Sequence, residues 1–362
     1  MLVEKSLFGV DEMKKPAKPP KNYGVPYMGS KNKIAKRLID FLPSAPVFVD
    51  LFAGGCAMTH AAMLSGKYQA FKCNDLDDAP SLFKNAVGGK YKNETRWISR
   101  EDYETLKNKD PYVRYLWSFG NRGRTYLYGR KVEPYRKALH YALFFGEYDG
   151  LKSGFGLDLS KLDEIDGGAY HFKKYKTPIG ANARRMLFKR EILAKDPRVK
   201  YLGHGHFAFK HDSTLMELER LQNLERLQNL ESLESLQNLE RLQSLENLER
   251  LESLQNLERL QSLEISQKDY RGVDLPPASE CVIYCDPPYQ NTTGYVAGDF
   301  DSDEFFDWAR EKAARGYKIF VSEYNAPADF ECVSEIPKRQ LLDSQGTGKI
   351  VMEKLFKPRG GA

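Results

Sequence analysis

Cysteine is scarce in this sequence, and the thiols are scattered. The 362 residues include five: Cys56, Cys73, Cys281, Cys285 and Cys332. Only Cys281 and Cys285 lie close together, and no second pair completes a set of zinc ligands. We therefore expect all five to be reduced and buried, as in a reducing compartment. His204 and His206 likewise have no evident third ligand, so we expect no metal site.

Long hydrophobic runs are also missing. No apolar stretch approaches the roughly 20 residues needed to span a bilayer. Residues 1–22 are rich in Lys and Pro and lack the apolar core of a signal peptide. We expect a flexible basic N-terminus on a cytoplasmic protein without a membrane partner. The overall composition, 41% hydrophobic and 29% charged, is typical of globular proteins and excludes collagen-like and low-complexity classes.

Negative charge is concentrated in one segment. Residues 215–264 contain eleven Glu and five Arg but no Asp or Lys, a formal charge of −6. The rest of the chain therefore carries +11 against the overall +5. A body that basic attracts polyanions through counterion release, which favours a nucleic acid as partner, although a solubilising surface could carry the same charge.

The acidic segment is also a repeat, with Leu at every third position from Leu215 to Leu263. Three residues turn an α-helix by about 300°, so successive leucines would circle a helix instead of forming a stripe. The period narrowly favours a solenoid-like arm over a helical hairpin. We expect residues 213–264 to be an insertion without chemistry that contacts another protein or a second copy of the chain.

Apolar runs alternate with helical patterns on both sides of the insertion. Residues 47–52, 281–285 and 317–322 are predicted strands, while residues 56–64 and 303–314 are predicted helices. This alternation is typical of an α/β protein with a mostly parallel sheet.

The clearest chemical motif is Asp286-Pro287-Pro288-Tyr289, directly after the strand predicted at 281–285. Two prolines cannot continue a central strand, so they form a stiff turn at its carboxyl end, the edge where ligands bind in open α/β sheets. The turn combines a carboxylate, a fixed carbonyl and an aromatic ring. This set suits an exocyclic amine on a planar base, with Asp286 and the Pro287 carbonyl accepting its N–H groups and Tyr289 stacking on the ring.

Three weaker motifs precede it. Gly54 and Gly55 follow the strand predicted at 47–52, so the backbone there can approach a ligand closely. Asp75 lies about twenty residues further on, where an acidic residue can bind ribose hydroxyls, although it could instead cap a helix. The third motif, Tyr27 to Lys31, places an aromatic residue and a lysine around a Gly turn before an amphipathic helix.

In this order the four motifs resemble those of DNA amino-methyltransferases, most closely the DNA adenine methylase (Dam-like) family. The resemblance implies a Rossmann-like methyltransferase sheet with helices on both faces, formed by residues 23–90 and 265–362. It implies a smaller target-recognition domain within residues 91–212. It also implies S-adenosylmethionine as methyl donor and double-stranded DNA as substrate.

The resemblance also implies residue roles. The cofactor-binding residues would be Tyr27, Lys31, Asp50, Gly54, Gly55, Asp75 and Asp286. Asp286, Pro287 and Tyr289 would be catalytic and would hold an adenine flipped out of the duplex. The family often has Glu-Pro in place of Asp50-Leu51 and a third Gly or Ser in place of Cys56. Basic residues expected to contact DNA, mostly at phosphates, are Arg122, Arg124, Lys173, Lys174, Arg184 and Arg185.

Other functions remain open at this point. The Asp-Pro-Pro-Tyr turn can hold any planar amine, so cytosine N4 or an RNA base is an alternative target. A catalytically inactive DNA-binding module with a repeat interaction arm is another, although the intact turn argues against it. Glutamine methyltransferases typically carry Asn in place of Asp286, and cytosine-C5 methyltransferases need a Pro-Cys dipeptide, which is absent here.

Overall fold

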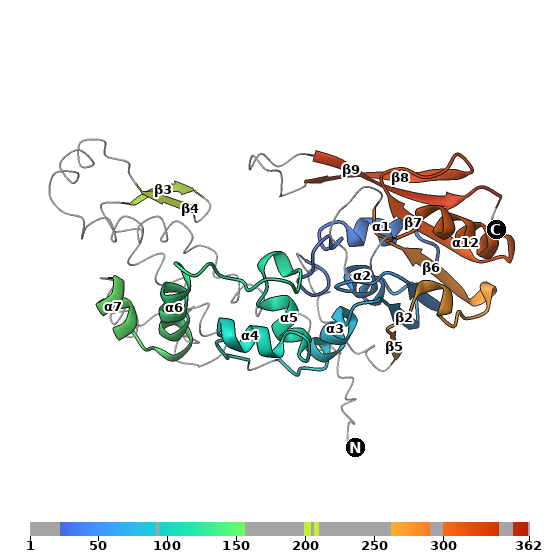
Figure 1. The fold of residues 1–362 in the computed structure, drawn as a ribbon. Helices are drawn as coiled ribbons and strands as arrows, with labels where there is room; N and C mark the ends of the chain where they lie inside the picture. The colour runs from blue at the N-terminus through green and yellow to red at the C-terminus, as the bar shows by residue number, and fades with distance from the viewer. Residues whose placement is uncertain are drawn as a thin grey trace, which may run out of the picture.

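The protein combines a seven-stranded mixed sheet, helices on both of its faces and a helical region beside it (Figure 1). The computed structural model describes residues 22–91, 94–155, 199–203, 206–209, 262–289, 300–339 and 350–360. The basic N-terminus and the repeat insertion lie outside these residues, apart from residue 22 and residues 262–264.

The sheet has the order β5-β2-β1-β6-β7-β9-β8. The strands are β1 (Val47–Asp50), β2 (Ala70–Asn74), β5 (Leu263–Ser266), β6 (Cys281–Cys285), β7 (Lys318–Glu323), β8 (Phe330–Arg339) and β9 (Ile350–Pro358). The first five in the order are parallel, and β9 runs antiparallel to both β7 and β8. The three strands predicted from sequence are confirmed to within two residues.

The strand β5 begins inside the repeat. Its first residue, Leu263, is the last leucine of the series and pairs with Phe71 of β2. The part of the sheet that follows the repeat therefore begins at Leu263, two residues before the domain boundary expected at residue 265. Leu263 is buried in the core of the sheet domain.

Helices cover both faces of the sheet. The sheet helices are α1 (Ala35–Phe41), α2 (Ala57–Ser65), α3 (Ala79–Val87) and α12 (Ser302–Ala314). Successive strand residues point to opposite faces. Phe48 accordingly joins the core under α1, α2 and α3, whereas Val49 joins the core under α12. All five residues of β6 are buried, as expected for a parallel strand covered on both faces.

The strand order reverses beside β1, and this reversal places the candidate site. The chain runs from β1 outward to β2 and β5, and then returns to the other side of β1 with β6. Ligands of open α/β sheets bind in the crevice at the carboxyl ends of the strands at such a reversal. Asp50 pairs in register with Tyr284, so Asp286 follows only two residues beyond the end of β1.

A helical region extends from the sheet on the side of α3 (Figure 1). Its helices are α4 (Arg100–Leu106), α5 (Pro111–Leu116), η1 (Phe119–Asn121), α6 (Glu133–Phe145) and α7 (Asp149–Phe155), and a separate ribbon contains β3 (Val199–Gly203) and β4 (His206–Phe209). Trp97 packs against Trp117 and Tyr128, with ring centroids 5.2 and 5.7 Å away. These rings belong to the same core as α1 to α3, so the region is packed onto the sheet domain.

The cysteines differ from expectation at one position. All five are free thiols, and four are buried, but Cys332 is exposed. Cys332 lies in β8, the edge strand that only β9 flanks, at the point where the register with β9 shifts. The expectation of five buried thiols was therefore wrong for Cys332.

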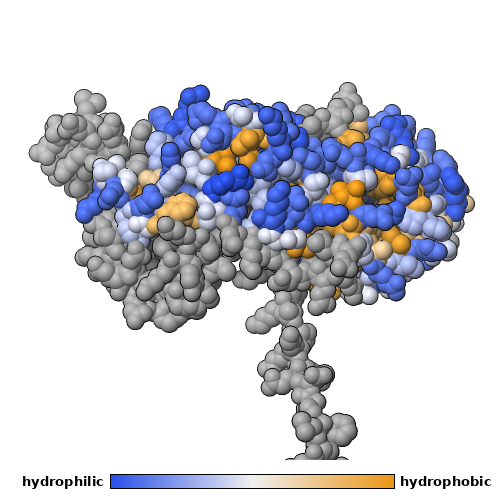
Figure 2. Space-filling model, turned by 90° about the horizontal axis from the view of Figure 1, so that it is seen from below, coloured by the Kyte–Doolittle hydropathy of each residue, from blue (hydrophilic) through white to orange (hydrophobic). Residues whose placement is uncertain are grey.

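The described surface is mostly hydrophilic, and Figure 2 shows apolar side chains in only a few small areas of one face. The large hydrophobic residues that are exposed are Phe41, Leu64, Leu76, Phe119, Ile350 and Met352. No helix of the described residues is both long and apolar enough to cross a membrane.

A tight backbone contact holds the chain at Gly24 against the turn at Gly55. Gly24 has φ +66°, and a Cβ added there would lie 2.2 Å from the carbonyl oxygen of Gly55. The next residue, Val25, donates its backbone N–H to that same oxygen at 2.8 Å. Only glycine therefore fits at Gly24.

We predict that Gly24→Ala lowers the melting temperature much more than Gly66→Ala does. Both positions have positive φ, which costs about 1–2 kcal/mol for alanine. Gly66 has no atom within 4 Å of its added Cβ, so only Gly24→Ala adds a clash with backbone. Equal losses in parallel thermal melts would contradict this account of the loop.

Candidate active site at the carboxyl edge of the sheet

The Asp-Pro-Pro-Tyr turn meets Lys31 at the end of β6. The Lys31 ammonium group donates to both carboxylate oxygens of Asp286, at 2.7 and 2.6 Å, and to the Tyr289 hydroxyl at 2.5 Å. Lys31 is only 3% exposed. Two motifs separated by 255 residues in sequence thus form one partly buried cluster.

A strand that the sequence did not single out completes this cluster. Glu353 of β9 accepts hydrogen bonds from the Tyr289 hydroxyl at 2.5 Å and from Ser322 Oγ at 2.7 Å. Its carboxylate also lies 3.5 Å from Lys31 Nζ and 3.7 Å from Lys338 Nζ. No local pattern predicts this role, because Glu353 is 64 residues from Tyr289.

Two further residues close the site on the side of β7. The ring of Tyr324 lies 4.7 Å from the ring of Tyr289, centroid to centroid. Glu323 is buried at the end of β7, where its carboxylate accepts the backbone N–H of Tyr324 at 2.7 Å. Sequence reasoning missed both, since they follow an ordinary apolar strand.

Asp75 organises the Gly turn after β1. One of its oxygens accepts the backbone N–H of Gly54 at 2.7 Å, and the other accepts that of Asp77 at 2.9 Å. Asp75 therefore lies beside the glycines, as the sequence suggested, and does not cap α3, whose N-cap is Asp78.

The two glycines make room for Tyr27. A Cβ on Gly54 would lie 2.8 Å from the Tyr27 ring, and one on Gly55 would lie 2.7 Å from Tyr27 Cβ. The Tyr27 hydroxyl in turn donates to Asp77 at 3.1 Å. The sequence argument attributed these glycines to close approach of a ligand, but the structure gives a further reason, namely the packing of the Tyr27 motif. Cys56, the next residue, has φ +57°, a conformation that favours glycine.

Asp50 lies under the turn rather than on its surface. It is buried, and its Oδ2 accepts a 2.7 Å hydrogen bond from Thr59 in α2. Its Oδ1 has no hydrogen-bond partner among the described residues, and neither does the buried hydroxyl of Ser30 beside Lys31.

Burial shapes the ionisation of the carboxyl groups. It raises the pKa of Asp50 to about 7, against the hydrogen bond from Thr59, and the pKa of Asp75 to about 6, against its backbone hydrogen bonds. Burial likewise raises the pKa of Asp286, which the Lys31 ammonium opposes. The charge of Asp286 contributes to both other shifts, so the three carboxyl groups lie within electrostatic reach of one another.

These residues fit a bound cofactor that is polar and cationic. The unpaired oxygens of Asp50 and Ser30 would be satisfied by a polar ligand or by water. Carboxyl groups whose pKa is raised by burial ionise more readily when a cation binds beside them. A sulfonium compound with ribose hydroxyls matches both features.

The expected DNA contacts are only partly described. Arg122 and Arg124 are exposed, whereas the other four basic residues, Lys173, Lys174, Arg184 and Arg185, lie outside the described residues. Between Ser118 and Tyr126, which form a β-bridge, the chain makes a tight loop with Phe119 65% exposed. Sequence reasoning missed Phe119, although it stands only three residues before Arg122.

That loop is anchored close to the Gly turn. Asn121 donates its side-chain N–H to the Tyr115 carbonyl at 2.9 Å, and Ser118 Oγ accepts the backbone N–H of Gly123 at 2.8 Å. The ring of Tyr115 packs 5.6 Å from that of Tyr27. The exposed loop is therefore connected to the Tyr27 motif through Tyr115.

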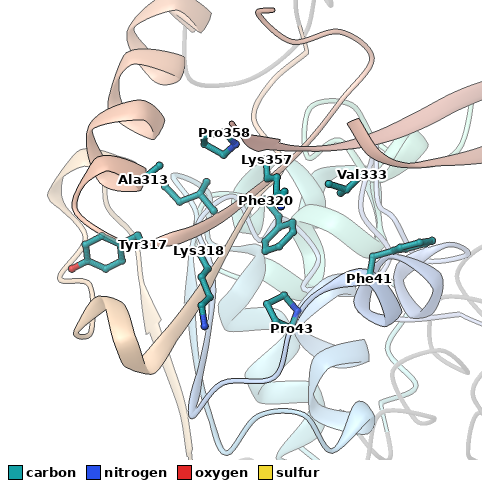
Figure 3. A pocket seen from close by; sticks show the side chains of 10 residues that line it. Phe41, Pro43, Ala313, Tyr317, Lys318, Phe320, Val333, Lys357 and Pro358 are labelled. Carbon is teal, nitrogen blue, oxygen red and sulfur yellow. The ribbon is translucent and has the colours of Figure 1, made fainter. Parts of the chain in front are cut away.

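A separate pocket lies at the opposite edge of the sheet (Figure 3). It has a volume of about 390 Å³, and its lining includes Phe41, Tyr317, Phe320 and Pro358 together with Lys318 and Lys357. Pro358 ends the antiparallel strand β9, so the pocket lies at the amino ends of the parallel strands, away from Asp286. Its described lining includes no carboxylate, histidine or cysteine, and we assign it no role in the chemistry.

The mixed α/β architecture with its seven-stranded sheet is consistent with a methyltransferase fold. A family model described as D12 class N6 adenine-specific DNA methyltransferase matches residues 27–128. The match confirms the resemblance to Dam-like adenine methyltransferases and supports an adenine-specific DNA methyltransferase. It spans Tyr27, Lys31, the Gly turn and the Phe119 loop, and it ends before Asp286. A search of curated proteins found no match to the chain.

We predict that Asp50→Asn stabilises the ligand-free protein at pH 8 but not at pH 5. The folded-state pKa of about 7 exceeds the usual 3.8, so the folded protein binds the extra proton. Stability from Asp50 is then lost as pH rises through 7, and the asparagine removes that loss while its oxygen can still accept from Thr59.

Thermal melts at both pH values measure this effect, with the exposed Asp274→Asn as control. If Asp50→Asn lowered the melting temperature at pH 8 more than at pH 5, the burial of an ionisable Asp50 would be the wrong explanation.

Proposed function

We propose that this chain transfers a methyl group from S-adenosylmethionine to N6 of an adenine flipped out of double-stranded DNA. The observation that carries the proposal is the partly buried cluster of Asp286, Tyr289 and Lys31 at the sheet edge that also holds the Gly turn. The carboxylate of Asp286, the ring of Tyr289 and the Gly turn lie together where the strand order reverses. A planar amine and a methyl donor could meet there.

The cofactor would occupy the part of the crevice near the Gly turn. Tyr27 and the turn of Gly54 and Gly55 would shape this half, and Asp75 would accept the ribose hydroxyls. Asp50, which is buried beneath the turn, would act by its charge and by holding α2 through Thr59. When bound, S-adenosylmethionine supplies a methyl group on a cationic sulfur, which keeps the bonding electron pair as the methyl group leaves.

The target adenine would occupy the half near β6 and β7. Tyr289 would stack on the flipped base, and Asp286 together with the Pro287 carbonyl would accept the two N–H bonds of N6. These hydrogen bonds favour a more tetrahedral nitrogen, whose lone pair attacks the methyl carbon in line. Asp286 would then take the proton that N6 loses. Burial raises the pKa of Asp286, and the Lys31 ammonium opposes that shift, so Lys31 favours the ionised form that accepts hydrogen bonds.

The helical region would bind DNA. The Phe119 loop offers an exposed aromatic ring and also contains the exposed residues Arg122 and Arg124. A stacking residue flanked by phosphate contacts is a common combination in proteins that hold unpaired nucleotides. We further propose that residues 91–212 form the target-recognition domain, that the repeat at 213–264 serves as a contact arm, and that the protein acts in the cytoplasm on DNA.

We predict that Asp286→Ala reduces methyl transfer by at least about a hundredfold, because the amine loses its acceptor, while DNA binding is largely retained. Transfer of tritiated methyl groups to DNA measures the first quantity, and a gel shift measures the second. Asp274→Ala, at an exposed carboxylate paired with Lys268, is the control and keeps full activity. Retained transfer by Asp286→Ala would refute the role of Asp286.

We predict different effects for the two kinds of residue in the Phe119 loop. Phe119→Ala weakens DNA binding about tenfold through lost stacking and leaves the salt dependence unchanged. Arg122→Gln reduces the slope of log K against log salt by about 1, because one phosphate contact is lost. Fluorescence anisotropy over a salt series distinguishes the two. Unchanged affinity in both variants would place the DNA elsewhere.

A further inference from the structure

Glu353 is the most completely buried carboxylate of the described site, with 0% exposure. It stands on β9, the one strand that runs antiparallel beside β7, and it faces Tyr289, Ser322 and Lys31. No sequence motif and no matched family segment includes it, since the match ends at residue 128.

The contacts of Glu353 are unequal between its two oxygens. Oε1 accepts from both the Tyr289 hydroxyl and Ser322, and Lys31 lies 3.5 Å away. Oε2 has no hydrogen bond among the described residues and only Lys338 nearby, at 3.7 Å. Although burial opposes it, the ammonium groups of Lys31 and Lys338 hold the pKa of Glu353 below its usual value. A buried anion at this position is costly unless it is paired, so its presence calls for a reason.

We propose that Glu353 is a positioning residue for methyl transfer, which fixes the Tyr289 ring and shares Lys31 with Asp286. The proposal rests on the proposed function and deepens it. Glu353 itself need not touch the base or the cofactor, since it acts through the hydroxyl of Tyr289 and the ammonium group of Lys31.

The first part of this role concerns the ring. An aromatic residue that stacks on a flipped base is most effective when its orientation is set before the base arrives. Tyr289 follows two prolines that stiffen the backbone but leave the side-chain torsions free. The 2.5 Å hydrogen bond to Glu353 and the contact with the Tyr324 ring restrict those torsions.

The second part concerns the charge. Lys31 engages both oxygens of Asp286 in the present arrangement. An incoming amine must bond one of these oxygens, so part of the ammonium's contact has to be released. Glu353 offers the ammonium group a second anion 3.5 Å away, and Asp286 can therefore turn to the amine without leaving a buried cation unpaired.

The test uses Glu353→Gln, which keeps an oxygen to accept from Tyr289 and Ser322 but removes the charge. We expect kcat to fall between about tenfold and a hundredfold, while KM for DNA and for S-adenosylmethionine stays within about twofold. The matched control is Glu335→Gln, the same change at an exposed carboxylate of the same hairpin, paired with Lys354. It should retain wild-type kcat.

A double-mutant cycle tests the link to the tyrosine. Tyr289→Phe keeps the ring but removes the hydroxyl, and Glu353→Ala removes its acceptor. If Glu353 acts through this hydroxyl, the kcat loss of the double variant is clearly smaller than the product of the two single losses. Tyr289→Phe does not alter the buried charge. If Glu353→Ala melts below the assay temperature, the kcat loss of Tyr289→Phe alone still measures what the hydroxyl contributes.

The outcomes separate the two proposals. A wild-type protein that transfers no methyl group to DNA overturns the proposed function and this inference with it. An active wild-type protein with an unchanged kcat in Glu353→Gln overturns the inference alone. Fully multiplicative losses in the cycle, or equal losses of kcat in Glu335→Gln and Glu353→Gln, overturn it as well.

Discussion

The ion pair between the buried Lys31 and the partly buried Asp286 is the contact on which the site depends. It joins the loop before α1 to the turn after β6, 255 residues apart in sequence. Two charges withdrawn from water are stable only with close geometry and further hydrogen bonds, and removing one partner of such a pair typically costs about 3–5 kcal/mol. The Tyr289 hydroxyl and Glu353 supply those further contacts. The position of the Asp-Pro-Pro-Tyr turn is thus set by a network rather than by the two prolines alone.

The carboxyl groups near the Asp286 turn are the part of the site that bears on the proposed cationic donor. Burial raises the pKa of Glu323 to about 7, as it does for Asp50, and raises that of Asp75 to about 6. Each of these groups is destabilised in its charged form as long as no cation lies beside it. A donor with a positive charge on sulfur relieves this destabilisation, while the uncharged product relieves less of it. Stability sacrificed at a functional site is a general feature of enzymes.

Local patterns predicted the frame of this protein but not its cross-connections. The strand at 281–285 was predicted with its exact ends, because an apolar run bounded by two prolines leaves little choice. The common edge of Asp75, the Gly turn and Asp286 followed from the rules of parallel sheets. By contrast, the bond from Lys31 to Asp286 and the role of Glu353 depend on tertiary packing across 255 and 64 residues. The exposure of Cys332 depends on an edge strand and a register shift that its sequence does not reveal.

The most direct test of the central claim is to identify the methylated nucleoside. Purified protein is incubated with unmethylated duplex DNA and isotopically labelled S-adenosylmethionine, the DNA is digested, and the nucleosides are analysed by mass spectrometry. The account predicts that the labelled nucleoside is N6-methyldeoxyadenosine. Labelled N4-methylcytosine alone, or no labelled nucleoside from a folded protein that binds the donor, would contradict it.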